Sequence, residues 1–119
     1  QAIEMAQKHP LSGGGIGSFV LELSDIAVDG VLVEPVHNVF YLVTAELGIL
    51  GLILMIGLFI SIALNIFKAK SPQAILASAT LTGLGVLSIF DHYLWTIAPG
   101  RLLLGLALGL WAGQVANDA

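Results

Sequence analysis

The sequence predicts an all-α fold: a fragment of a polytopic membrane protein with about three transmembrane helices and an extracytoplasmic N-terminal region. Of its 119 residues, 57% are hydrophobic and only 10% are charged, whereas soluble domains carry about a quarter charged residues. Most of the acidic residues lie in 1–37, while 38–119 holds long uncharged runs. We therefore divide the chain into an extracytoplasmic loop segment, 1–37, with a short amphipathic helix, and a transmembrane helical region, 38–119.

The N-terminal segment predicts a short amphipathic helix over Gln1–Lys8 that ends at His9. The glycine-rich run "SGGGIGS" that follows resembles a nucleotide-binding loop only superficially, because such a loop needs a preceding strand. We expect a tight loop that returns the chain towards the membrane. Residues 18–34 are compatible with a short helix or with a hairpin. Since Gln1 already lies in a predicted helix, we expect the chain to be part of a longer polypeptide.

Three apolar stretches predict spanning helices over about 47–67, 73–90 and 98–115. A span needs roughly 20 apolar residues, which the first stretch supplies without a charge. Ser71 is a good N-cap for the second, and Pro72 suits its first helical position. The third stretch is shorter and crosses the membrane only if residues 97–101 extend the helix, with the Arg101 side chain reaching to the membrane interface.

The tight link between the first two spans predicts that they form an antiparallel hairpin, and it also predicts the orientation of the spans. Lys68 and Lys70 place that link in the cytoplasm by the positive-inside rule, and the acidic N-terminal third agrees with this. Residues 1–46 and 91–101 are then extracytoplasmic. In the third span Gly105, Gly109 and Gly113 recur every four residues and form a groove for a neighbouring helix. We expect further transmembrane helices of a longer chain as packing partners.

The stretch "EPVHNVFYLVTAELGILG" brings polar side chains to the membrane edge. A helix is predicted to begin near His37-Asn38, where unpaired N–H groups attract anions. Glu46 points about 180° away from His37, so the two do not form a dyad. Glu46 either lies at the interface or is buried and needs a partner. His37 is either a surface imidazole or a general base, a role for which histidine is well suited at neutral pH.

Residues 91–101 form a second outer loop, which is predicted to face the same compartment as His37. Asp91 either pairs with Arg101 or orients a substrate. His92 and His37 together suggest a metal site, but two histidines without a third ligand make a poor one, so no metal is expected. The chain has no cysteine, which excludes disulfides and thiolate chemistry, and it has no basic surface typical of nucleic-acid binding.

Three blocks in order resemble the C-terminal part of the O-antigen ligase and polymerase superfamily. They are "HPLSGGGIGSF" (9–19), "HNVFYLVTAELGILGLIL" (37–54) and "FDHYLWTIAPGRLLLGLALGL" (90–110). The chain departs from the family pattern at Ala98-Pro99, where many members carry glutamines. The resemblance covers about half the chain and also favours a helix after residue 18.

The resemblance implies glycosyl transfer at the outer face of the bacterial inner membrane. A glycan would pass from undecaprenyl diphosphate to a hydroxyl of a glycan, lipid or protein acceptor, without a cofactor or metal. On this reading His37 is the catalytic base, Arg101 helps to neutralise the diphosphate, and Asn38, Tyr41 and Asp91 shape the substrate pocket. The alternative is a non-catalytic membrane module whose outer loop binds a partner.

Overall fold

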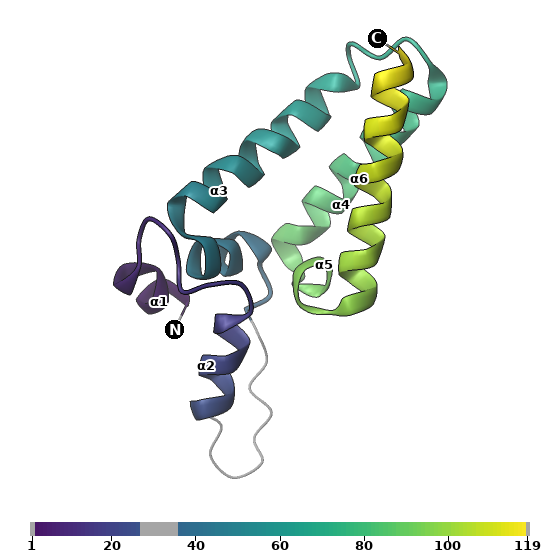
Figure 1. Cartoon of the computed structure of the whole chain (residues 1–119). Coiled ribbons are helices and arrows are strands. Elements are labelled where there is room, and N and C mark those ends of the chain that lie inside the picture. The colour runs from purple at the N-terminus through teal and green to yellow at the C-terminus, as the bar shows by residue number, and fades with distance from the viewer. Residues whose placement is uncertain (1, 27–35, 119) are drawn as a thin grey trace.

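The computed structural model describes residues 2–26 and 36–118, and within these ranges it is all-helical, without strands (Figure 1). The helices are α1 (Ala2–Lys8), α2 (Ser18–Ile26), α3 (Val39–Asn65), α4 (Pro72–Phe90), α5 (Tyr93–Thr96) and α6 (Ala98–Asp118). The predicted helices near the N-terminus and after residue 18 are therefore confirmed. The rest of the ambiguous 18–34 segment, residues 27–35, lies outside the described residues.

Helix α3 begins at the predicted place but is broken inside. Asn38 is its N-cap, and its Oδ1 accepts hydrogen bonds from the N–H groups of Phe40 (2.9 Å) and Tyr41 (3.3 Å). Gly48 has φ 68° and ψ −169°, which no α-helix contains. The break leaves backbone groups on both sides of Gly48 without their helical partners, and such groups need others when they are buried.

The glycine-rich loop supplies those partners. Gly14 N–H donates to the carbonyl of Ala45, and Gly15 N–H donates to the carbonyl of Glu46, each at 2.9 Å. Ile49 N–H donates in turn to the carbonyl of Pro10, also at 2.9 Å. The predicted tight loop thus supplies backbone hydrogen bonds to the broken part of α3.

Two glycines make this close backbone approach possible. A Cβ atom on Gly13 would collide with the backbone of Glu46, and one on Gly48 would collide with the backbone of Leu11. Both glycines also have a positive φ, which other residues adopt at a cost. The runs "SGGGIGS" and "AELGILG" therefore depend on each other.

A small hydrophobic core lies beside the glycine-rich loop and the break in α3. It contains Met5 of α1, Phe19 of α2, and Leu42 and Ala45 of α3, all buried. The Trp95 side chain of α5 packs against the same cluster. Four helices are thereby joined at one end of the molecule.

The rest of the molecule is a bundle of the long part of α3 with α4 and α6 (Figure 1). The tight link makes α3 and α4 the predicted antiparallel hairpin, and Ser71 caps α4 by accepting from Ala74 N–H at 3.2 Å. The buried Ser78 hydroxyl joins the three helices, because it accepts from Asn65 Nδ2 (3.1 Å) and Trp111 Nε1 (3.0 Å).

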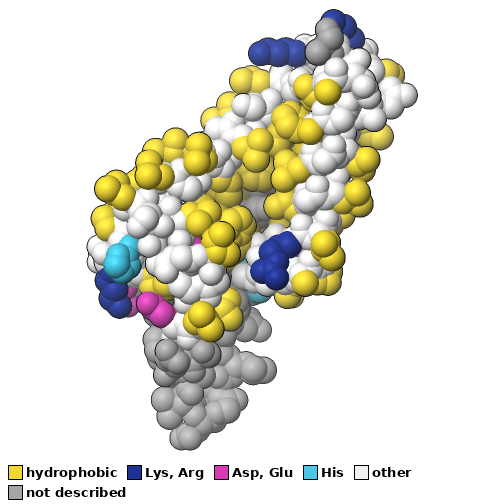
Figure 2. Space-filling view, viewed as in Figure 1, with side chains coloured by type: hydrophobic (Ala, Val, Ile, Leu, Met, Phe, Trp, Pro, Cys, Tyr) yellow, Lys and Arg dark blue, Asp and Glu magenta, His cyan; other side chains and the backbone are white. Residues whose placement is uncertain are grey.

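Two of the described helices, α3 and α4, are long and apolar enough to cross a membrane. Only 11% of the most apolar window of α3 and 28% of that of α4 is buried within the chain. The predicted third span forms α6, but Arg101 and Gln114 leave it less apolar than the other two. Figure 2 shows hydrophobic side chains over most of the bundle's length, with charged side chains gathered towards its two ends.

Candidate functional site

Two segments distant in sequence bring three potential ligand side chains together. His37 precedes α3, and Asp91 and His92 lie between α4 and α5. Each offers a nitrogen or carboxylate oxygen, and these atoms all lie within 4.8 Å of one another. The ring centroids of His37 and His92 are 5.1 Å apart. His37 is exposed, Asp91 is half-buried and His92 is buried.

The neighbours of His92 favour one protonation state of its ring. Its Nδ1 lies 2.6 Å from the Thr96 hydroxyl oxygen, and that hydroxyl donates to the His92 carbonyl oxygen at 3.1 Å. A hydroxyl has one proton. With that proton directed to the carbonyl, Nδ1–H is the donor to Thr96. These contacts favour the tautomer of neutral His92 that has its lone pair on Nε2, where it can bind an ion.

Asp91 ends α4 and starts the next turn. Its Oδ1 accepts from Tyr93 N–H at 3.2 Å, which fixes the carboxylate beside the two imidazoles. Asp91 was expected either to pair with Arg101 or to orient a substrate. Among the described residues Asp91 and Arg101 form no ion pair, so the expected pairing is not found. The carboxylate is instead available to the histidines.

The remaining predicted substrate residues of this segment have different surroundings. The Asn38 side chain caps α3 and occupies two of the N–H groups that were expected to attract an anion. Tyr41 follows on the first turn of α3 and is 52% exposed. Asn38 therefore positions the segment that carries His37, while Tyr41 presents its ring at the surface.

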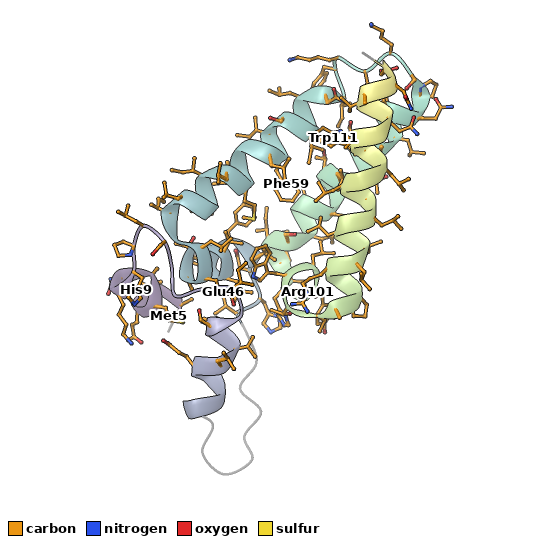
Figure 3. The ribbon with its side chains drawn as sticks, in the orientation of Figure 1. Met5, His9, Glu46, Phe59, Arg101 and Trp111 are labelled. Carbon is orange, nitrogen blue, oxygen red and sulfur yellow. The ribbon has the colours of Figure 1, made fainter. Side chains whose placement is uncertain are left out.

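A second polar site lies in a cavity of about 360 Å³ between α2, the break in α3, α5 and the start of α6. Glu46 and Arg101 both line it, and Figure 3 shows these two side chains at the same end of the molecule. The wall is otherwise mainly apolar and includes Val20, Leu104 and Leu108. A cavity with a few polar groups in an apolar wall is typical of a ligand site.

The two charged residues of this cavity differ in their surroundings. Glu46 is only 2% exposed, and its Oε2 accepts from Trp95 Nε1 at 2.9 Å. The sequence left Glu46 either interfacial or buried with a partner, and the second alternative is correct. Arg101 is exposed and its side chain makes no hydrogen bond or ion pair with the described residues. Its guanidinium is thus available to an anion.

Thr96 connects the two sites. Its hydroxyl contacts His92, and the residue also lines the cavity with Glu46 and Arg101. The structure therefore brings His37 together with Asp91 and puts Arg101 in the adjoining cavity. Sequence reasoning paired His92 with His37 but missed Asp91 as a third ligand, and it missed Trp95 as the partner of Glu46. The adjacency of Asp91 and His92 was the available signal for the third ligand, because one loop then supplies two ligands.

Comparison of the chain with known protein families, with curated proteins and with solved structures gives no match.

Proposed function

We propose that this chain is part of a membrane enzyme of the O-antigen ligase and polymerase type. It would pass a glycan from undecaprenyl diphosphate to an acceptor hydroxyl at the outer face of the bacterial inner membrane. The observation that carries the proposal is the convergence of His37 and Asp91 beside a cavity lined by Arg101. A base, a carboxylate and an available cation are the groups that such a transfer needs.

The reaction assigns one task to each of these groups. The acceptor oxygen attacks the anomeric carbon of the glycan, and its proton passes to His37. The bond between that carbon and the diphosphate oxygen breaks, and the electron pair leaves with the diphosphate. Arg101 neutralises the charge that develops there, since guanidinium binds phosphate oxygens well. Asp91 stabilises the protonated imidazole, and Asn38 caps the start of α3 next to His37.

A bilayer around the bundle fits the distribution of side chains. Large apolar side chains of α3 and α6 are exposed, such as Leu54 (74%) and Leu102 (74%), and water would solvate them poorly. His37 precedes α3, whereas Lys68 and Lys70 follow its end, so the length of this helix separates them. With the lysines in the cytoplasm, the His37 cluster faces outward.

Thiol labelling in intact cells tests this orientation. The chain has no cysteine, so single cysteines can be introduced without background from this segment. A cysteine at exposed Ser12 should react with an impermeant reagent, while one at Ala69 should react only after the cells are opened. The reverse pattern would place the His37 cluster in the cytoplasm and contradict the outer-face reaction.

The transfer itself is tested by His37→Ala in the full-length protein. A general base contributes roughly 10² to 10⁴ in rate, so glycan transfer in vitro should fall by that factor. His37→Gln keeps hydrogen-bonding ability but cannot take the proton, so it should fail as well. His9→Ala is the matched control, because His9 follows α1 and is not in the cluster. Transfer by well-folded His37→Ala at the wild-type rate would refute the assignment.

One observation favours the alternative, a non-catalytic module that packs against other helices. A Cβ atom on Gly105, Gly109 or Gly113 would meet open space, so the glycine groove of α6 has no partner among the described residues. Gly109→Leu in the full-length protein should disturb assembly on either reading. Only the module predicts that His37→Ala leaves all function intact, and the transfer assay therefore separates the two.

A further inference from the structure

The cluster of His37, Asp91 and His92 has the donor set of a metal site. We propose that these three side chains bind a divalent transition-metal ion, with Zn²⁺ as the best candidate. Neutral imidazole nitrogens and carboxylate oxygens are common zinc ligands, and three protein ligands with an open fourth position are typical of accessible zinc sites. This binding is a property of the cluster and does not depend on the proposed transfer.

The geometry needs only a small adjustment to close around an ion. Ligand atoms about 2.0–2.1 Å from a tetrahedral Zn²⁺ are roughly 3.3 Å from one another. The present ligand atoms lie within 4.8 Å, so the widest pair has to approach by about 1.5 Å. His37 is the most accessible of the three ligands, because it is exposed and precedes the first turn of α3. Its exposure also gives the ion a path from solvent.

The other two ligands are already held in place. The Nδ1 of His92 contacts Thr96, which orients the ring and leaves Nε2 for the ion. Metal-binding histidines commonly have such a partner on the nitrogen that does not bind the metal. Tyr93 N–H holds one oxygen of Asp91 and leaves the other for the ion. Asp91 supplies a carboxylate to the cluster, and its negative charge attracts a cation.

A bound ion would also affect the proposed reaction. It would occupy the nitrogen with which His37 is proposed to accept the proton, so Zn²⁺ would inhibit transfer. This consequence, unlike the binding itself, rests on the proposed function. Inhibition is therefore measured separately from binding, and a failure of the transfer proposal leaves the metal proposal intact.

The binding test uses the full-length protein in detergent after treatment with a chelator. Titration with Zn²⁺ against a chromophoric chelator of known affinity should show a site that His9→Ala retains. His37→Ala and Asp91→Asn should each weaken binding by more than 10-fold, since each removes or neutralises a ligand. Thr96→Val, which loses only the contact that orients His92, should weaken it by roughly 10- to 100-fold. Circular dichroism checks that the variants are folded.

Co²⁺ provides a second readout that depends on geometry. It should give the intense visible absorption of a tetrahedral site in the wild type and in His9→Ala, and lose it in His37→Ala. His37→Ala is the safest of these variants for folding, because the side chain is exposed. Equal Zn²⁺ affinity in the wild type, His37→Ala and Asp91→Asn would overturn the proposal. So would the absence of wild-type binding at micromolar Zn²⁺.

Discussion

The two ends of the molecule are stabilised in different ways. At the site end, α1, the glycine-rich loop, α2 and the first turns of α3 satisfy one another through backbone hydrogen bonds and a buried core. Along the bundle, α3, α4 and α6 share a few polar contacts and expose most of their apolar side chains. Leu42 at the site end is fully buried, whereas Leu106 of α6 is 62% exposed. Among the described residues, the site end thus has a buried core that joins several segments, whereas most large apolar side chains of the bundle are exposed.

Gly48→Val should produce the largest loss and should fall on the site end alone. Valine has to adopt a positive φ and its side chain meets the backbone of Leu11, so the loop cannot remain on the helix break. We expect a loss on the order of 3–5 kcal/mol in the free energy of unfolding. Thermal unfolding in detergent and hydrogen exchange of residues 9–17 would measure it.

Gly57→Ala is the matched control on the bundle part of the same helix. A Cβ atom there meets nothing within 4 Å, and Gly57 has no positive φ. Alanine should therefore stabilise α3 by about 0.5–1 kcal/mol. If Gly48→Val unfolded at the same temperature as Gly57→Ala, the loop would not be held by the break in α3.

The two tryptophans allow a side-by-side test with the same substitution. Trp95→Phe removes the indole donor from buried Glu46 and should cost about 1–3 kcal/mol, because a buried acceptor loses its partner. Trp111→Phe removes one donor from Ser78, which keeps Asn65 Nδ2, so the cost should be about 0.5–1.5 kcal/mol. Denaturant titration of both variants gives the comparison.

Equal losses for the two tryptophan variants would mean that Glu46 is solvated once Trp95 is gone. The double variant Trp95→Phe/Glu46→Gln sharpens the result. Glutamine replaces the unpaired carboxylate of Glu46 with a neutral amide. It should restore part of the stability if burial of the unpaired carboxylate caused the loss. No restoration would point to lost packing of the indole ring.

The smallest effect is expected at the end of the bundle, where Asp118 accepts hydrogen bonds from the N–H groups of Lys70 (2.6 Å) and Ser71 (3.0 Å). The first of these bonds is the main cause that lowers the pKa of Asp118 from 3.8. A lowered folded-state pKa gives stability that is present above pH 3.8 and is lost as the pH falls through the folded value.

This pH dependence is measured as the difference in unfolding temperature between the wild type and Asp118→Asn. The difference should be positive at pH 6 and should shrink as the pH falls below 4. Because Asp118 lies at the surface and is only partly buried, we expect a small difference that salt reduces further. A difference that grew at low pH would contradict the sign of the shift.

Much of the fold follows from local sequence. Apolar length predicted α3 and α4, and Ser71 and Pro72 predicted the start of α4, because capping and proline geometry act within one turn. The start of α3 at Asn38 was predicted for the same reason. The break at Gly48 was not predicted. Its cause is the backbone of residues 10–15, and no local pattern shows that distant segments pair.

The candidate site divides in a similar way. His37 and Asp91 were selected from residue type and from the side of the membrane that each was predicted to face. Their proximity, and the combination of Asp91 with the two histidines in one cluster, depend on how the α4–α5 link lies against the start of α3. Asp91 was weighed as a partner of Arg101 because the two share a loop. The fold instead turns Asp91 towards the histidines and leaves Arg101 in the adjoining cavity.

The sequence by itself determined the all-helical character, the antiparallel hairpin and the available chemistry, because hydrophobic length, caps and residue types act locally. Tertiary structure decided which of those residues meet. The burial of Glu46 against Trp95, the loop seated on the break at Gly48, and the convergence of His37 with Asp91 and His92 each join segments far apart in the chain. Such contacts depend on the packing of several helices at once, and a local pattern does not encode them.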